Sequence, residues 1–194
     1  MFRSCKFFCS AYDKKSFPSL GVPEIAFIGR SNVGKSSLIN AITSNRHNAR
    51  TSSSPGCTRK INFYLKEGHV ALVDLPGYGY SKASKEEVHY YLEMIRYYLS
   101  SREALHRLVL LIDSKVGLKD IDIDFLEWIE ACGVNYSIVL TKADRLSESK
   151  LHAMVSLVQD QVRNFCLVLY PIMVVSAKSG NGIKELAREI SKCI

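Results

Sequence analysis

Runs of aliphatic residues alternate along this chain with segments in which apolar residues repeat every three or four positions. The runs are typical of buried strands and cover residues 24–28, 108–112, 137–140 and 171–175. Helical spacing is found in residues 37–42, 88–99, 121–129, 151–162 and 183–190. Strands that alternate with helices predict a mainly parallel sheet with helices on both faces.

Two further β-type runs, residues 61–65 and 70–73, are separated by four residues and predict a hairpin. The hairpin reverses one strand. The expected fold is therefore α/β, with a six-stranded sheet that has one antiparallel edge strand. No repeat or linker divides the sequence, so we expect one domain, residues 22–194, after a basic N-terminal extension, residues 1–21.

A phosphate-binding loop joins the first predicted strand to the first helix. It matches Gly-x-x-x-x-Gly-Lys-[Ser/Thr] and consists of Gly29, Arg30, Ser31, Asn32, Val33, Gly34, Lys35 and Ser36, followed by Ser37. Glycines let such a loop curl so that its N–H groups and the next helix N-terminus face an anion. We expect Lys35 to reach the β- and γ-phosphates and the Ser36 hydroxyl to bind Mg²⁺. The fold class is then that of a P-loop NTPase G domain.

A second motif, Asp74-Leu75-Pro76-Gly77, stands at the end of a predicted strand. Asp74 can hold Mg²⁺ through water, and the Gly77 N–H can meet the γ-phosphate. A polar loop before the hairpin supplies the third contact. Thr58 is the expected second Mg²⁺ ligand there, with Thr51 as a competing candidate, and the predicted nucleotide contacts of this loop are Gly56, Cys57, Thr58, Arg59 and Lys60.

The base is expected to be selected by Thr141, Lys142, Ala143 and Asp144, which follow the strand 137–140. The Asp144 carboxylate can accept hydrogen bonds from N1–H and N2–H₂ of guanine, and adenine lacks this donor pair. The end of the last strand adds backbone groups that can meet guanine O6, from Val175, Ser176, Ala177 and Lys178. These motifs together predict GTP as the nucleotide.

Charge is distributed unevenly over the 194 residues, whose net charge is +7. Residues 1–68 hold eleven Lys and Arg against three acids, whereas residues 113–150 hold five against eight. A basic segment suggests a polyanionic partner, the alternative being charge that serves only the nucleotide and solubility. Because the sequence shows no long apolar run and no lipidation signal, we expect no membrane attachment. The six cysteines form no C-x-x-C pair, so a cytoplasmic protein with reduced thiols is expected. It is expected to be a monomer.

With these motifs in place, the chain resembles the EngB (YihA/YsxC) family of bacterial ribosome-assembly GTPases, in the TrmE-Era-EngA-EngB-Septin-like superfamily. The likeness is carried by residues 23–40, 55–63, 74–80 and 141–144. It implies a GTP-binding protein with slow GTPase activity that acts as a switched factor in large ribosomal subunit assembly. It also implies a requirement for normal cell division and septation. The implied partners are GTP or GDP and the rRNA and proteins of the large-subunit precursor.

Three positions qualify this resemblance. Thr141 replaces the asparagine that other GTPases use to brace the base loop, which predicts weaker nucleotide binding. Tyr78 stands where Ras-like proteins keep a water-orienting glutamine, so hydrolysis is expected to be slow. Asn32 matches the position that binds K⁺ in several related GTPases, and K⁺ there would stabilise transition-state charge. The residues expected to act in hydrolysis are Lys35, Thr58, Gly77 and Asn32, with Arg59 and Lys60 as alternative charge donors or rRNA contacts.

Two other functions compete with this one. A signalling switch of the Ras/Arf type would need a membrane anchor, and Tyr78 also argues against it. A small-molecule kinase with a P-loop would not need the guanine-selecting Asp144.

Overall fold

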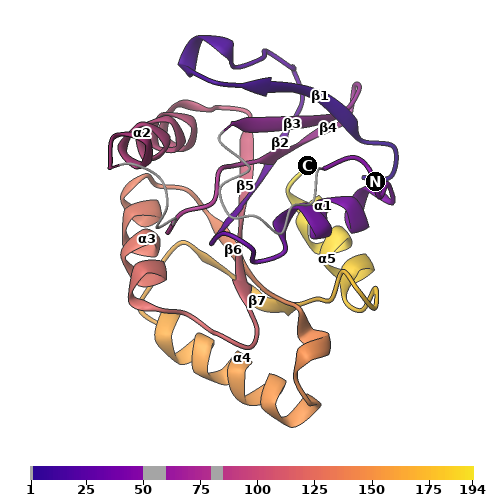
Figure 1. The fold of residues 1–194 in the computed structure, drawn as a ribbon, viewed down its shortest axis with the longest axis vertical. Coiled ribbons are helices and arrows are strands. Elements are labelled where there is room, and N and C mark those ends of the chain that lie inside the picture. The colour runs from indigo at the N-terminus through magenta and orange to yellow at the C-terminus, as the bar shows by residue number, and fades with distance from the viewer. Residues whose placement is uncertain (1, 50–59, 80–84) are drawn as a thin grey trace.

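The structure is a computed structural model that describes residues 2–49, 60–79 and 85–194 (Figure 1). The predicted nucleotide contacts Gly56, Cys57, Thr58 and Arg59, and the alternative Thr51, lie outside these residues. No helix within the described ranges is long and apolar enough to cross a membrane.

Within the described residues, seven strands form one sheet in the order β1-β3-β4-β2-β5-β6-β7. Their bounds are β1 Lys6–Ala11, β2 Glu24–Gly29, β3 Ile61–Lys66, β4 Val70–Asp74, β5 Leu105–Asp113, β6 Tyr136–Thr141 and β7 Val168–Val174. β3 pairs antiparallel with both β1 and β4, and the other pairs are parallel. β3 therefore runs against all the other strands, and the expected α/β G-domain fold is confirmed.

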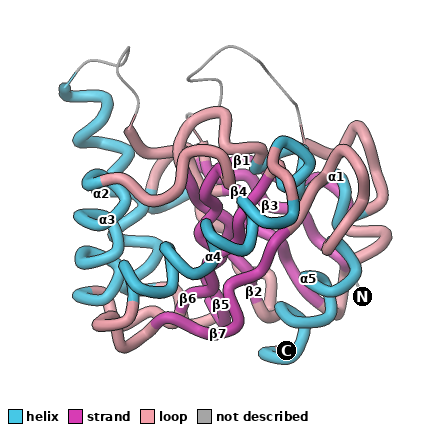
Figure 2. The backbone as a smooth tube through the Cα atoms, turned by 90° about the horizontal axis from the view of Figure 1, so that it is seen from below, coloured by secondary structure: helices cyan, strands magenta, loops and turns pink. Residues whose placement is uncertain are grey.

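Helices cover both faces of this sheet (Figures 1 and 2). The α-helices are α1 Lys35–Thr43, α2 Lys85–Ser101, α3 Asp120–Ala131, α4 Glu148–Val162 and α5 Ile183–Ile190. The part of the chain that the structure describes also contains the short 3-10 helices η1 Lys14–Ser16, η2 Ala143–Arg145 and η3 Ser191–Cys193. Helices α1 and α5 pack on one face, and α2, α3 and α4 pack on the other.

The alternation of side chains along β2 shows how the sheet separates two cores. Ile25 and Phe27 belong to the cluster under α1 and α5, whereas Ala26 and Ile28 belong to the cluster under α2, α3 and α4. All four are fully buried. Because successive residues of a strand point to opposite faces, a continuous apolar run is what a strand covered on both sides requires.

The sheet has seven strands rather than the expected six, because residues 6–11 add β1 at its edge. The antiparallel strand β3 is consequently second from the edge. A register shift between Phe7 and Cys9 interrupts the side-chain alternation of β1, and this break removes the two-residue period by which a strand is recognised in a sequence. The last strand, β7, begins at Val168 rather than at the predicted Pro171. Because β7 is the other edge strand, Pro171 can lie within it although proline has no N–H to donate to a neighbouring strand.

Candidate nucleotide-binding site

The carboxyl ends of four neighbouring parallel strands meet at one edge of the sheet. Gly29 ends β2, Asp74 ends β4, Asp113 ends β5 and Thr141 ends β6. The register aligns Gly29 with Leu111, and Asp113 with Thr141. The loops after these strands carry the phosphate motif, the Asp-x-x-Gly motif and the base motif, and α/β sheets bind ligands at this edge.

The phosphate loop needs glycine at both ends for different reasons. A Cβ at Gly29 would lie 2.6 Å from the Leu111 carbonyl oxygen of the neighbouring strand. Gly34 has a φ of 104°, which side chains strongly disfavour, and it is the N-cap of α1. Helix α1 begins at Lys35, so its free N–H groups border the loop. Both glycines thus shape a backbone cradle of the kind that binds phosphate.

Lys35 and Asp74 come together although they are far apart in the sequence. The Lys35 ammonium donates to the Asp74 carboxylate, and both side chains are almost fully buried. The other Asp74 oxygen lies 3.5 Å from the Asn62 amide nitrogen. Leu75, next in the chain, donates its N–H to the Phe27 carbonyl at 3.0 Å and fixes the start of the Asp-x-x-Gly loop against β2.

Gly77 of the same motif packs directly on the phosphate loop. A Cβ there would lie 3.0 Å from the Gly29 carbonyl oxygen and 3.3 Å from the Ser31 nitrogen. Arg30 and Tyr78 form an isolated parallel β-bridge beside this contact. The structure therefore brings the phosphate loop and the Asp-x-x-Gly loop together, as their motifs predict.

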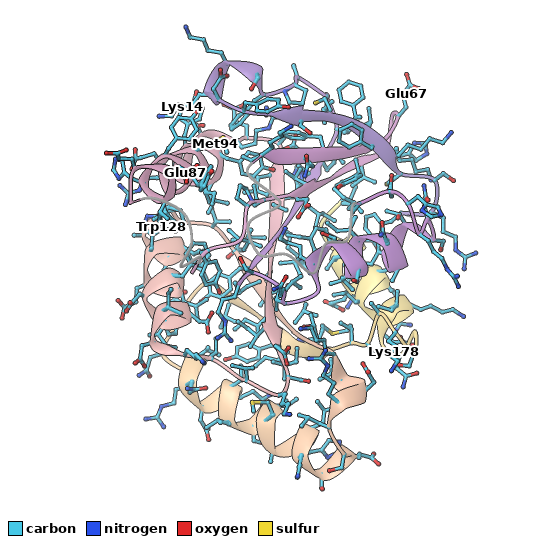
Figure 3. The ribbon with its side chains drawn as sticks, in the orientation of Figure 1. Lys14, Glu67, Glu87, Met94, Trp128 and Lys178 are labelled. Carbon is cyan, nitrogen blue, oxygen red and sulfur yellow. The ribbon has the colours of Figure 1, made fainter. Side chains whose placement is uncertain are left out.

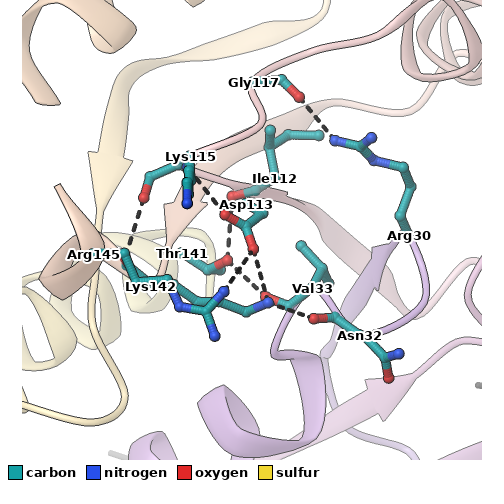
Figure 4. A network of polar contacts seen from close by, with 11 residues as sticks. Arg30, Asn32, Val33, Ile112, Asp113, Lys115, Gly117, Thr141, Lys142 and Arg145 are labelled. Atoms are coloured by element: carbon teal, nitrogen blue, oxygen red, sulfur yellow. Dashed lines mark hydrogen bonds and ion pairs between the residues drawn. The ribbon is translucent and has the colours of Figure 1, made fainter. Parts of the chain in front are cut away.

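A charged network ties the phosphate loop to the base loop (Figure 4). The Lys142 ammonium donates to the Asn32 carbonyl at 2.6 Å and to Asp113 Oδ2 at 2.8 Å. Arg145 lies 3.6 Å from the same Asp113 oxygen. Lys142 has a φ of 56°, a left-handed conformation that Asp113 and Asn32 hold in place.

Thr141 braces the same two loops through its hydroxyl. The hydroxyl donates to the Val33 carbonyl at 2.7 Å and lies 3.2 Å from the Ile112 carbonyl. Because a threonine hydroxyl has one proton, the shorter contact is the hydrogen bond. Thr141 thus makes one of the bonds that a longer asparagine amide could make, which gives a physical basis for looser bracing of the base loop.

Asp144 is exposed and is oriented by the next strand loop. The Ser176 hydroxyl donates to Asp144 Oδ1 at 2.6 Å. This hydrogen bond, reinforced by the positive charges of Lys178 and Arg145, lowers the pKa of Asp144. The Ala143 N–H donates to the Val175 carbonyl at 3.1 Å and joins the two base loops. An ionised, oriented and accessible carboxylate is what recognition of guanine requires.

Tyr78 points away from the phosphate loop and into the core. Its hydroxyl donates to Asp122 Oδ1 at 2.7 Å, and its ring stacks on Phe125 with centroids 4.2 Å apart. Asp122 is fully buried and also receives the Lys119 N–H at 2.8 Å. Burial, with the Asp122 carboxylate beside it, raises the pKa of Tyr78, so its hydroxyl stays a donor.

Arg30 of the phosphate loop joins this cluster. Its Nε lies 3.2 Å from Asp122 Oδ1, and its Nη2 donates to the Gly117 carbonyl at 2.8 Å. The Arg30 guanidinium therefore contacts the loop before α3 and α3 itself. Among the predicted nucleotide contacts, Lys60 also lies elsewhere, with its ammonium over the ring of Tyr12.

Two carboxylates of the site were missed by motif reasoning. Asp113 directly ends a buried aliphatic strand, a position typical of ligand-edge residues. Asp122 stands three, four and seven residues before buried Phe125, Leu126 and Ile129, so a charge interrupts the apolar stripe of α3. Such a charge on a buried stripe indicates a partner, here Tyr78 and Arg30.

The oxygen donors at the loop edges fit the Mg²⁺ that this fold implies. Ser36 supplies a hydroxyl in the first turn of α1, and Asp74 supplies a carboxylate at the end of β4. Mg²⁺ takes few protein ligands and keeps waters and phosphate oxygens. The described ranges contain no group of three or more His, Cys, Asp or Glu that could hold a metal ion.

Comparison with known proteins agrees with this geometry. A family model described as 50S ribosome-binding GTPase matches residues 24–142. A probable GTP-binding protein EngB from Anaplasma phagocytophilum (strain HZ) is 67% identical over 190 residues, with 98% of each chain covered. The protein of the same name from Ehrlichia ruminantium (strain Gardel) is 54% identical over 191 residues, covering 98% of this chain and 94% of the relative.

Solved structures share the fold. A crystal structure of a probable GTP-binding protein EngB superposes with a TM-score of 0.69 at 23% identity, covering 88% of this chain and 98% of the other. Era in complex with MgGDPNP and nucleotides 1506–1542 of 16S ribosomal RNA gives a TM-score of 0.70 at 21% identity, covering 89% and 56%. The chain belongs to the EngB family of GTP-binding proteins.

Proposed function

We propose that this protein is a slow GTPase whose nucleotide state times its binding to a precursor of the large ribosomal subunit. The observation that carries the proposal is the convergence of the phosphate loop, the Asp-x-x-Gly loop and the base loop at one sheet edge. Lys35 joins the first two through Asp74, and Lys142 joins the base loop to Asn32 and Asp113. The matched family description and the basic N-terminal segment support the ribosomal partner. The role is cytoplasmic and monomeric, and cell division and septation depend on it.

The proposed chemistry is attack of water on the γ-phosphate of GTP. Lys35 neutralises the β- and γ-phosphate oxygens, and Gly77 offers its N–H to the γ-phosphate. Ser36, Thr58 and, through water, Asp74 would hold Mg²⁺, which would supply positive charge at the phosphates. Asp144 selects guanine. Exchange of the Lys35–Asp74 contact for contacts to phosphate would make the Asp-x-x-Gly loop sensitive to the nucleotide.

Co-sedimentation with large ribosomal subunits tests this function. Purified protein is loaded with GDP or a non-hydrolysable GTP analogue and layered with large-subunit precursors on a sucrose gradient. We expect binding in one nucleotide state to exceed binding in the other by about tenfold, which corresponds to a coupling free energy of about 1.4 kcal/mol. Equal recovery in both states would contradict a nucleotide-timed role.

Tyr78→Phe is expected to lower stability without a large effect on hydrolysis. The hydroxyl is bonded to Asp122 rather than directed at the phosphate loop, so it has no water to orient. Its loss removes a hydrogen bond to a buried carboxylate and should cost about 1–3 kcal/mol of the free energy of unfolding. Thermal unfolding and single-turnover GTP hydrolysis measure the two effects.

The control for this substitution is Tyr136→Phe, which removes a hydroxyl 3.4 Å from Glu130 at the opposite end of the sheet. We expect hydrolysis by Tyr78→Phe and by the control to stay within about threefold of the parent rate. A tenfold fall in Tyr78→Phe alone, with the fold intact, would assign the hydroxyl to the reaction instead.

Potassium is proposed to assist hydrolysis through Asn32. Asn32 has a φ of 63°, and its amide is directed away from the Lys142 network (Figure 4). Turnover in KCl should exceed turnover in NaCl by about tenfold, because K⁺ at the β- and γ-phosphates stabilises developing charge. Asn32→Ala should abolish the difference between the two salts. Equal rates of the parent protein in KCl and NaCl would exclude this role.

A further inference from the structure

Three exposed tyrosines, an exposed lysine and a half-buried lysine from separate segments gather beside α2 and the end of β1. We call this the tyrosine–lysine surface, and it consists of Tyr12, Lys14, Lys60, Tyr90 and Tyr97. The three tyrosines expose 55%, 50% and 40% of their surface, in chain order. Figure 3 shows Lys14 on η1 near α2. Large aromatic side chains exposed together mark an interaction surface more often than isolated ones do.

Contacts within the surface hold its rings in place. The Tyr90 hydroxyl donates to the Tyr12 carbonyl at 2.7 Å and joins α2 to the end of β1. The Lys60 ammonium lies 4.1 Å from the Tyr12 ring centroid, and Lys14 lies 4.7 Å from that of Tyr97. A surface ordered before binding loses less side-chain entropy when a partner arrives, which favours affinity.

The pairing of each lysine with an aromatic ring indicates the chemistry of the partner. Lysine is depleted in protein–protein interfaces, where tyrosine is enriched. Single-stranded nucleic acids need both groups, because unpaired bases stack on aromatic rings and phosphates pair with ammonium groups. We propose that the tyrosine–lysine surface binds single-stranded RNA. This proposal rests on the proposed ribosomal function, which supplies RNA as the partner.

Acidic residues limit where the RNA backbone can pass. Asp13 caps η1 by accepting the N–H groups of Lys15 and Ser16, so its carboxylate is partly engaged. Glu86 and Glu93 share the helical stripe of Tyr90 and Tyr97 on α2, and Glu93 lies 3.7 Å from Arg96. The phosphates therefore follow the η1 and β3 side, where Lys14 and Lys15 stand on η1 and Lys60 directly precedes β3.

The surface also borders the segments expected to respond to the nucleotide. Lys60 lies two residues after the proposed Mg²⁺ ligand Thr58 and directly before β3. Helix α2 follows the Asp-x-x-Gly motif in the chain. Differences between the GTP and GDP states at these two segments would reach the surface through the backbone, so RNA affinity should depend on the nucleotide.

Fluorescence anisotropy with a labelled RNA of about 12 nucleotides, single-stranded or annealed to its complement, tests the proposal. The full chain is titrated with GDP or a GTP analogue present. We expect Tyr12→Ala and Tyr97→Ala each to weaken single-strand binding by about tenfold through lost stacking. Lys14→Ala should weaken it less and lower the salt dependence by about one unit of slope.

Tyr170→Ala is the matched control, since Tyr170 is 51% exposed on β7 at the opposite edge of the sheet. Its RNA affinity should stay within about twofold of the parent value. Each variant is checked for affinity toward a fluorescent GDP analogue, which should not change, and for a cooperative thermal unfolding transition, which should be kept although Tyr97→Ala also loses the ring contact with Phe17. Unchanged RNA affinity in both tyrosine variants overturns the proposal, as does equal binding of duplex and single strand.

Co-sedimentation with large subunits separates this inference from the function on which it rests. The protein could bind RNA through its tyrosines and yet not co-sediment with large subunits. This outcome would support the RNA-binding surface and contradict the ribosomal role. Loss of co-sedimentation in Tyr12→Ala with RNA affinity unchanged would mean that the surface meets a ribosomal protein, and the RNA proposal would fail.

Discussion

Asp144→Asn is expected to change the preferred base of this protein from guanine to xanthine. The carboxylate accepts hydrogen bonds from N1–H and N2–H₂ of guanine, whereas an asparagine amide would place an N–H group against the guanine amino group. Xanthine carries an oxygen at that position and can accept the amide proton. We expect GTP affinity to fall by about a hundredfold to a thousandfold and XTP affinity to rise by a similar factor, since polar sites reject a mismatched base strongly.

The structure explains why this change should act on specificity rather than on folding. Asp144 is exposed, and its Oδ1 receives the Ser176 hydroxyl at 2.6 Å. An asparagine carbonyl oxygen can accept the same bond, so the side chain keeps its orientation. The lowered pKa of Asp144 keeps the parent carboxylate ionised at neutral pH, and guanine recognition should weaken only in acid.

Competition of GTP, XTP and ATP against a fluorescent GDP analogue measures the change in preference. For Asp144→Asn, which binds the GDP analogue poorly, the corresponding fluorescent xanthine nucleotide is the reporter. Asp160→Asn, an exposed aspartate on α4, is the control and should retain the parent order of affinities. If Asp144→Asn kept its preference for GTP over XTP, the assignment of the base loop would be wrong, and with it the proposed function.

The positions of strands and helices could be predicted because their apolar patterns are strong. β2 and β6 are fully buried, and α5 buries Ile183, Leu186 and Ile190 on one side. Such segments reveal their period without knowledge of their neighbours. β1 could not be predicted, since half of its residues are exposed and its pairing with β3 is bulged. Only the partner strand, more than fifty residues away, defines it.

The motif residues of the site could likewise be predicted, because phosphate and guanine chemistry restricts residue type and spacing. The supporting contacts could not. Asp113 joins Lys142 to the phosphate loop, and Asp122 joins Tyr78 to Arg30, through side chains that come from different loops. No local pattern specifies these pairs, since the fold alone brings them together. Arg30 and Lys60 are predicted nucleotide contacts because of their positions in the motifs. In the structure the Arg30 side chain donates to the Gly117 carbonyl, and the Lys60 ammonium lies over the Tyr12 ring.

Glu24 shows the same dependence on distant partners at the other end of β2. Its side chain is fully buried, and its Oε2 accepts Arg102 Nε at 2.9 Å and the Tyr98 hydroxyl at 2.8 Å. Arg102 Nη2 donates both to Glu24 Oε1 and to the Pro18 carbonyl. The hydrogen bonds to Glu24 raise the pKa of Arg102. Glu24 and Arg102 thus tie β2 to α2 and to the segment between η1 and β2.

Glu24→Gln is therefore expected to lower the free energy of unfolding by about 3–5 kcal/mol, because it leaves the half-buried Arg102 guanidinium facing an amide N–H₂ group. For a chain of this length the melting temperature should fall by on the order of 10 °C. Urea unfolding followed by circular dichroism measures the loss. Salt should alter it little, since a buried pair is poorly screened.

Two controls separate the ion pair from the other contacts of Glu24. Tyr98→Phe removes one donor and leaves the pair intact, so it should cost about 1–3 kcal/mol. Glu185→Gln changes an exposed glutamate on α5 and should cost less than about 0.5 kcal/mol. Because Glu24 and Gly29 stand at opposite ends of β2, the folded fraction of Glu24→Gln should bind GDP normally. A Glu24→Gln loss no larger than that of Tyr98→Phe would show that the pair with Arg102 stabilises nothing beyond its hydrogen bonds.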